Sequence, residues 1–578
     1  MASLENNKKS NFLVQAGILA AAGFISRIIG LLYRSPLTAI IGDLGNGYYQ
    51  AAYNIYTIIL LISSYSIPSA ISKVIAQKLG VKEYRNAHRI FRCSVWYVLA
   101  VGGVASLFLF FGAGFLVDGA AIPVLRVFAP TIFLYGLLGV LRGYFQAHRS
   151  MVQTSVSQIL EQIANALVSI GAALFLIHIF VPDSAARIGE MLGKTLSGQP
   201  ALYGAAAGAV LAGQDAAYEV NHAMYGAIGS ALGTGAGVSI GLLFMWSVYA
   251  LNRGVLLRRA DRDRNHEVES YRNISKLIVM VVTPFILSTA AYNLSTSLNS
   301  TVYLKLYRAV KGLDEATVYA NYGVFSGKAV TICNIPVAFA SAMTSAMIPA
   351  VAQLMAQENY EGTRLRVGMA VKSTMILAIP CSVGMFALAK PVTWLLFPQK
   401  ATIDLAARLL MAMAVSVVFF SLSTLSSSVL QGIGKVNTPI YNALIALAVQ
   451  TVTLVVLLLY TNLDLYALVI ANIVYSGLMC ILNQVAVRRA IDYRQEFRHT
   501  FLLPFAAAAV MGVVALLVYH GLYLLTSSTV VSVIPAILIA AGVYFVLLIL
   551  FRAVTEQELC GLPKGYLLVK VAKKCRLL

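Results

Sequence analysis

Two cationic residues lie deep inside long apolar stretches, where a charge is costly and therefore indicates a function. Arg27 lies in the apolar stretch 11–33, and Lys328 lies in the stretch 318–350. An arginine at the centre of a membrane helix costs roughly 2.5–3.5 kcal/mol to insert, unless it faces water or a partner. At helical spacing the other members of the Arg27 face are small or cationic: Ala16, Ala20, Gly23, Gly30 and Arg34. We therefore predict that Arg27 and Lys328 line a wet cavity, with Arg34 near its outer end. The alternative for the Arg27 face is a stripe for helix packing, with the arginine paired to a neighbour.

Polar side chains in two other spans are further evidence for the predicted cavity. Asn54 shares a helical face with Gln50 and Thr57, and Asn293 lies in the polar stretch 288–301 that follows Pro284. The polar groups of this stretch find no hydrogen-bond partners in lipid, so the stretch is expected to face water or protein. We predict that Asn54 and Asn293 line the cavity. The alternative for 288–301 is a kinked packing helix whose Ser and Thr side chains bond to their own backbone.

Glu161 is the one acidic residue, of 23, that falls deep inside an apolar span. It belongs to a polar stripe with Gln158, Gln162 and Asn165. We predict that Glu161 forms an ion pair with a cation such as Arg27 or Arg142. A role as a proton carrier is the alternative.

The composition is that of a polytopic helical membrane protein. Of 578 residues, 59% are hydrophobic and only 11% are charged, whereas soluble domains carry about 25% charged residues. A spanning helix needs about 20 apolar residues, and alternation with period two, typical of a transmembrane β-barrel, is absent. We predict an all-α fold with about 14 transmembrane helices. The predicted spans are 11–33, 48–72, 93–117, 123–146, 153–180, 223–250, 276–304, 318–350, 368–390, 404–431, 438–460, 464–487, 500–524 and 530–552.

The net charge of +20 is explained by the orientation of the chain in the membrane and not by nucleic-acid binding. Most Lys and Arg residues fall in alternate loops and at both termini, which is the positive-inside pattern. We therefore predict a cell-membrane protein with both termini in the cytoplasm. The densest basic cluster, at 252–265, is predicted to be a solvated cytoplasmic loop, with contact to anionic lipids as its alternative.

Catalytic and cofactor chemistry is not indicated. The six cysteines form no CxxC pair and the seven histidines form no ligand-spaced group. Four glycines at 229, 233, 237 and 241 follow no strand, so helix packing explains them better than a phosphate loop. We expect no enzyme activity, no metal and no cofactor.

The first twelve spans suggest two copies of one six-helix unit. The sequence at 69–84 aligns with that at 345–360, with five identities. We predict an N-terminal lobe at 1–252 with an extracytoplasmic insert at 181–221, a basic cytoplasmic linker at 253–275, a C-terminal lobe at 276–490, two further helices within 491–552 and a basic tail at 553–578. Because Arg27 and Lys328 lie in different copies, we predict one shared chamber.

Five segments carry a family resemblance. SRIIGLLYRSPL (26–37), GNGYYQAAYNIY (45–56), SIPSAIS (66–72), LRGYFQA (141–147) and SQILEQ (157–162) resemble a branch of the MOP (MATE-like) superfamily. It is the branch of lipid-linked oligosaccharide flippases that contains MurJ and stage V sporulation protein B. The resemblance implies a V-shaped pair of parallel six-helix lobes with two additional helices, and alternating access to a cationic chamber. Ser26 and Arg27 match the family's first-helix motif.

The resemblance implies transport of an undecaprenyl-diphosphate-linked sugar from the inner to the outer leaflet, with lipid II as the first candidate. We expect Arg27, Arg34 and Lys328 to hold the diphosphate. The expected partners are this substrate and membrane lipids, with cell-wall synthesis proteins as further candidates, and the protein is expected to be a monomer. Three alternatives remain: a flippase for a capsule, teichoic-acid or spore-envelope unit, a cation/drug antiporter, and a non-transporting scaffold for cell-wall assembly.

Overall fold

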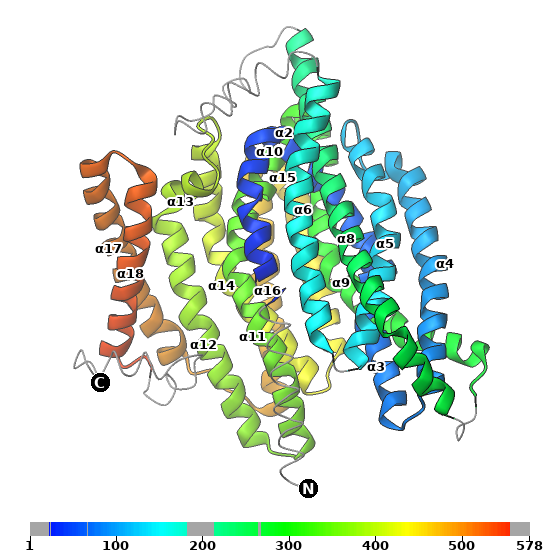
Figure 1. Cartoon of the computed structure of the whole chain (residues 1–578). Helices are drawn as coiled ribbons and strands as arrows, with labels where there is room; N and C mark the ends of the chain where they lie inside the picture. Colours follow the sequence, from blue (N-terminus) through cyan, green and yellow to red (C-terminus); the bar gives the residue numbers. More distant parts are fainter. Residues whose placement is uncertain are drawn as a thin grey trace. The chain divides into compact units, whose positions relative to one another are not determined.

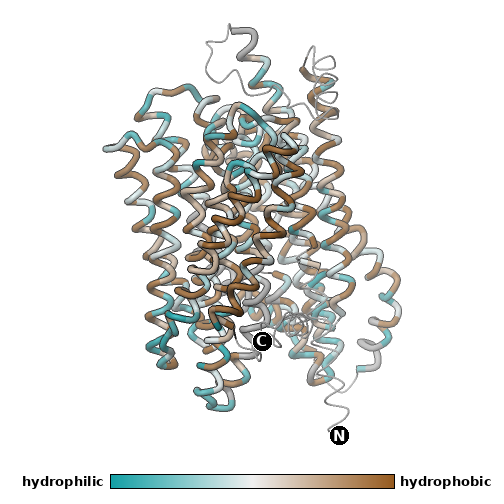
Figure 2. The backbone as a smooth tube through the Cα atoms, turned by 90° about the vertical axis from the view of Figure 1, so that its left-hand side faces the viewer, coloured by the Kyte–Doolittle hydropathy of each residue, from teal (hydrophilic) through white to brown (hydrophobic). Residues whose placement is uncertain are grey.

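The protein is all helical over the residues that its computed structural model describes. Those residues are 22–23, 25–65, 67–148, 150–181, 213–263 and 268–554, without the side chains of several helical stretches such as 281–296. Most of the predicted insert 181–221, part of the basic linker and nearly all of the predicted tail 553–578 lie outside them. Hydrophobic residues dominate the middles of the helices, and hydrophilic ones gather towards their ends and in the loops (Figure 2). This distribution is the one that a lipid bilayer requires.

The helices pack into two units, with the division after Gly323. The helices of the first unit are α2 (Arg34–Leu60), the π-helical η1 (Leu61–Tyr65), α3 (Ile67–Gly80), α4 (Tyr84–Leu116), α5 (Ala121–Ala147), α6 (Met151–Phe180), α8 (Gly213–Arg262), α9 (Tyr271–Lys311) and α10 (Glu315–Gly323). Those of the second unit are the π-helical η2 (Val324–Val330), α11 (Thr331–Ala356), α12 (Tyr360–Ala387), α13 (Ala389–Leu396), α14 (Ile403–Gly432), α15 (Asn437–Tyr460), α16 (Leu465–Ile491), the π-helical η3 (Arg498–Leu502), α17 (Leu503–Thr526) and α18 (Thr529–Leu550). Figure 1 labels most of them.

Most predicted spans coincide with observed helices. Within the described residues, ten helices are long and apolar enough to cross a membrane. The total of about 14 spans stays a prediction. The last two spans of the prediction are α17 and α18, which lie side by side (Figure 1).

One predicted connection is largely helical. The connection expected between the first two spans, at 34–47, is helical: α2 runs through it and departs from helical geometry at Gly42, where φ is 71°. Only glycine takes this conformation at little cost. The predicted span 318–350 is helical throughout, as α10, η2 and α11, and it contains a seven-residue π-helical segment.

The division after Gly323 places α9 and α10 with the first unit, whereas the predicted lobe boundary lies in the linker 253–275. Hydrogen bonds explain the grouping of α9. Its Ser297 Oγ donates to the backbone oxygen of Asn54 in α2, at 2.7 Å. At its start, the Glu269 carboxylate accepts a hydrogen bond from Lys78 of α3. Burial alone would lower the pKa of Lys78, but the carboxylates of Glu269 and Glu83 outweigh it and raise that pKa. The six-helix repeat stays a prediction.

Glycines bring helices of the first unit into backbone contact. A Cβ at Gly233 of α8 would lie 2.0 Å from Ser169 Oγ of α6, and a Cβ at Gly237 would lie 2.5 Å from the backbone oxygen of Glu161. Membrane helices associate through such close packing, since lipid offers them no hydrophobic drive towards each other. The prediction that the α8 glycines serve helix packing is confirmed.

The crossing of α2 and α10 is the tightest of these contacts. A Cβ at Gly47 would lie 1.9 Å from the backbone oxygen of Tyr319, and a Cβ at Gly323 would lie 2.0 Å from that of Asp43. Each helix thus presents a glycine to the other helix's backbone. No side-chain rotation can relieve a clash there.

The first prediction concerns this crossing. We expect Gly47→Ala to lower the free energy of unfolding by at least the ~1–3 kcal/mol typical of overpacking, because α10 must move away from α2. Thermal unfolding of the purified protein in detergent measures this. The matched control is Gly103→Ala in α4, where a Cβ meets nothing within 4 Å. Equal stability of the two variants would contradict the close contact between α2 and α10.

Candidate substrate-binding site

Arg27 lies on a helical stretch just before α2, and its side chain is exposed. Open space surrounds the same face further back, because a Cβ at Gly23 would meet nothing within 4 Å. One turn after Arg27, a Cβ at Gly30 would lie 3.6 Å from Gln162 Oε1. These contacts favour an open or polar surface over a tight packing stripe. The face members Ala16 and Ala20 lie outside the described residues.

Arg34 opens α2 among tyrosines. It is half-buried, and it lies near the side chains of Tyr33, Tyr49 and Tyr53. The Tyr33 hydroxyl also accepts a hydrogen bond from Asn165 Nδ2 of α6, at 3.3 Å. Along α2, the break at Gly42 lies between Arg34 and the two later tyrosines. The result is a guanidinium group held among aromatic rings and hydroxyls.

An aromatic row continues along α2 from this arginine. Tyr49, Tyr53 and Tyr56 recur at helical spacing, and each lies against Phe128 of α5, with ring centroids 4.7–5.9 Å apart. The Tyr49 hydroxyl lies 3.4 Å from Thr234 Oγ1 of α8. This row is not among the predicted site residues, although the i, i+4, i+7 spacing of its tyrosines is visible in YYQAAYNIY.

Glu161 forms an ion pair inside the first unit. Its carboxylate accepts a hydrogen bond from Arg142 of α5 at 2.7 Å, and Arg142 Nε donates to Ser157 Oγ at 2.8 Å. The side chains are 7% and 14% exposed. Of the two partners that the sequence offered, the structure pairs Glu161 with Arg142. This pairing neutralises both charges where α5 and α6 meet.

Asn54 takes part in packing. Its Nδ2 donates to the Tyr322 hydroxyl of α10 at 2.7 Å, and its backbone oxygen accepts the hydrogen bond from Ser297. Asn54 therefore links three helices of the first unit. Asn293 lies within α9, but its side chain is outside the described residues. A role of either residue in substrate binding stays a prediction.

Lys328 lies in the π-helical η2 and is 1% exposed. Its ammonium group donates a 2.6 Å hydrogen bond to Thr402 Oγ1, at the start of α14. A buried ammonium ion needs such partners, because isolated burial of a charge is very costly. Single π turns inside α-helices are frequent at functional sites.

The predicted site residues thus belong to separate units. Arg27, Arg34 and Glu161 lie in the first unit, and Lys328 lies in the second. Within the first unit the structure brings Arg34 together with Tyr33, Tyr49 and Tyr53. The shared chamber stays a prediction. Over the described parts of the chain, no group of three His, Cys, Asp or Glu side chains could hold a metal ion.

The second prediction tests the ion pair. We expect Arg142→Gln to destabilise the protein by ~3–5 kcal/mol, because it leaves a buried carboxylate without its partner. Adding Glu161→Gln should recover most of that loss, because no unpaired charge remains. A double-mutant cycle on thermal unfolding measures the coupling. If the two single losses simply add in the double variant, the pair contributes no coupling energy and the assignment is wrong.

Comparisons with known proteins agree with this architecture. The family described as polysaccharide biosynthesis protein matches residues 12–197, and the MatE family matches residues 327–457. Lipid II flippase MurJ of Bacillus subtilis (strain 168) is 21% identical over 86% of this chain and 86% of its own length. Stage V sporulation protein B of the same organism is 23% identical over 96% of this chain and 98% of its own length.

A solved structure shares the fold. Lipid II flippase MurJ in an inward closed conformation superposes with a TM-score of 0.61, at 15% identity, over 92% of this chain and 97% of that chain. Together with the two family matches and the two relatives, this likeness confirms the predicted resemblance. The chain is thus similar in sequence to MurJ and stage V sporulation protein B of Bacillus subtilis, and it shares the fold of the solved MurJ structure.

Proposed function

We propose that this protein is a flippase that moves an undecaprenyl-diphosphate-linked sugar from the inner to the outer leaflet by alternating access, with lipid II as the first candidate. The observation that carries the proposal is the presence of charged cations within membrane helices of a chain whose relatives include a lipid II flippase. A diphosphate is the anionic part of such a substrate. Inserting a cation into lipid costs free energy, so ionisable residues within membrane helices typically mark a substrate pathway.

We infer that Arg27 and Arg34 contact the diphosphate. The planar guanidinium group can donate two hydrogen bonds to phosphate oxygens at once. Arg34 is half-buried beside Tyr33, Tyr49 and Tyr53. The aromatic row beyond it offers flat faces and hydroxyl groups, which suit a sugar. Asn54 and Asn293 are proposed as further polar contacts.

Lys328 needs a conformational step to meet the substrate. In the structure its ammonium group is covered and bonded to Thr402. We propose that the substrate phosphate replaces Thr402 as its partner in another state of the transport cycle. The exchange is favourable on electrostatic grounds, because a hydrogen bond between two charged groups is about twice as strong as one to a neutral group.

The membrane potential is a sufficient driving force for this transport. An interior-negative potential favours outward movement of an anion by about 2.3 kcal/mol per charge per 100 mV. A diphosphate therefore gains from the potential without a separate ion site. Since Glu161 is paired with Arg142, the structure gives no argument for proton coupling through that carboxylate.

A flippase for another lipid-linked unit, such as a capsule or teichoic-acid precursor, uses the same diphosphate chemistry. Depletion of the protein followed by lipid analysis separates these substrates. The lipid-linked intermediate that accumulates in the inner leaflet identifies the sugar. Accumulation of none would favour a scaffold, and export of cationic drugs would favour an antiporter.

The third prediction concerns the cations. We expect Arg34→Gln and Lys328→Gln each to lower the flipping rate at least tenfold, since a hydrogen bond to a charged group contributes about 1.5–3 kcal/mol. The measurement is flipping of a fluorescent lipid-linked sugar diphosphate in proteoliposomes, with thermal stability checked in parallel.

The matched control is Lys390→Gln, which removes an exposed cation paired with Asp404 at 2.7 Å. This variant should flip substrate at the wild-type rate. Near-normal flipping by the Arg34 and Lys328 variants, when stably inserted, would refute the cationic site.

A further inference from the structure

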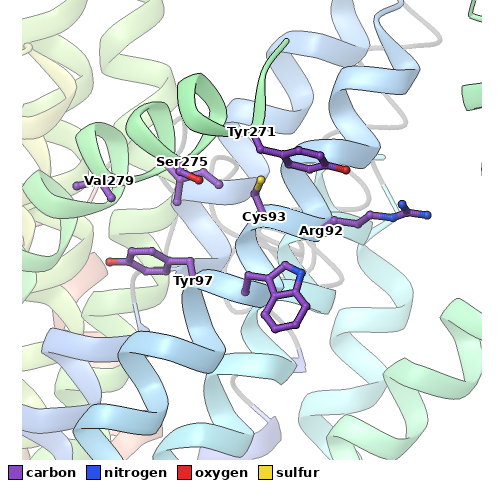
Figure 3. A pocket seen from close by; sticks show the side chains of 8 residues that line it. Arg92, Cys93, Tyr97, Tyr271, Ser275 and Val279 are labelled. Atoms are coloured by element: carbon purple, nitrogen blue, oxygen red, sulfur yellow. The ribbon is translucent and has the colours of Figure 1, made fainter. Parts of the chain in front are cut away.

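A pocket of about 560 Å³ opens on the first unit between α4 and α9. Figure 3 shows Arg92 and Tyr271 at one end of it and Tyr97 and Val279 at the other, with Cys93 and Ser275 between them. The remaining lining residues are Trp96 and Ile278. The pocket therefore has a cationic, hydroxyl-bearing end and a more apolar end.

The charge of this region is positive. Arg92 is exposed at the pocket, and Arg89 stacks on the Tyr271 ring, 4.1 Å from its centroid. Arg89 Nε is buried and finds no hydrogen-bond acceptor in the described structure. Arg253 of α8 and Arg92 both lie near Tyr249. A buried donor without an acceptor is costly, so the site is suited to an anion.

The neighbouring carboxylates already accept hydrogen bonds from other groups. Glu83 and Glu269 both accept hydrogen bonds from Lys78. Asp263 accepts one from the backbone nitrogen of Arg85, at 3.1 Å. Among the described residues, Arg89 Nε is left without a hydrogen-bond acceptor. An external anion can therefore supply the missing acceptor.

The pocket lies at the predicted edge of the bilayer. The predicted spans of α4 and α9 begin at residues 93 and 276, and the positive-inside pattern assigns this end to the cytoplasm. Trp96 is 72% exposed, as expected of the aromatic belt at a membrane interface. Exposed apolar side chains continue from the pocket along both helices, with Val279 and Met280 on α9 and Val104 and Leu107 on α4.

We propose that this pocket binds one anionic phospholipid of the cytoplasmic leaflet, such as phosphatidylglycerol. The headgroup phosphate accepts hydrogen bonds from Arg92 and Arg89. The acyl chains lie along Trp96 and Val279. This site is separate from the residues proposed for the transported substrate, and it is filled by a lipid that stays in place. Charge at one end and apolar surface at the other favour a lipid over a free anion.

The test is native mass spectrometry of the purified protein with phosphatidylglycerol and phosphatidylcholine. We expect the wild type to bind phosphatidylglycerol more tightly. Arg92→Gln should weaken that binding about fivefold, since each cation near a membrane surface contributes about 1 kcal/mol to anionic-lipid binding. Adding Arg89→Gln should weaken it about fivefold again. Binding of phosphatidylcholine should not change.

The matched control is Arg489→Gln, which removes an exposed arginine at the end of α16 and should leave the lipid preference unchanged. Glycerol phosphate, which lacks acyl chains, should not displace the lipid. Displacement by glycerol phosphate would show a free-anion site, and displacement by a lipid-linked sugar diphosphate would show a substrate site. Either result, or equal binding of the two phospholipids, overturns the proposal.

Discussion

A charged or polar side chain within the bilayer must be satisfied inside the protein, because no water is available there. This constraint explains the most specific contacts of the structure. Arg142 is held by Glu161 and Ser157, and the Lys328 ammonium group donates to Thr402. In the second unit the fully buried Asn483 side chain donates to Ser427 Oγ at 2.8 Å and accepts from Asn442. Polar residues therefore determine which helices are neighbours.

Close packing supplies the rest of the stability. The glycines of α8 admit α6 to backbone distance, and Gly47 and Gly323 do the same for α2 and α10. At such distances, side chains reach backbone acceptors on the next helix, as Ser169 Oγ does at the Ser230 oxygen. Small residues and interhelical hydrogen bonds thus act together, as is usual in membrane helix bundles. The same contacts fix the positions of Arg34 and the tyrosines around it.

The sequence predicted the fold well, since long apolar stretches and cation placement depend on the bilayer rather than on tertiary detail. Local conformation was not readable from the sequence. The segment 34–47 is helical except at Gly42, where a positive φ interrupts α2, and the π turn around Lys328 has no sequence signature. The sequence indicated how deep in a span each charged residue lies, but it did not indicate which side chain that residue contacts. Glu161 faced two candidate cations in the sequence, and only the packing of α5 on α6 selects Arg142.

The pairing of Arg142 with Glu161 has a consequence for how the chain enters the membrane. Its two helices, α5 and α6, are joined by only the short segment between Ala147 and Met151, so they can enter the lipid together as a hairpin. A single helix carrying an unpaired charge costs roughly 2.5–3.5 kcal/mol to insert. A hairpin in which the opposite charges already meet avoids most of that cost. The ion pair that stabilises the folded bundle thus also makes co-translational insertion of α5 feasible before the remaining helices are synthesised.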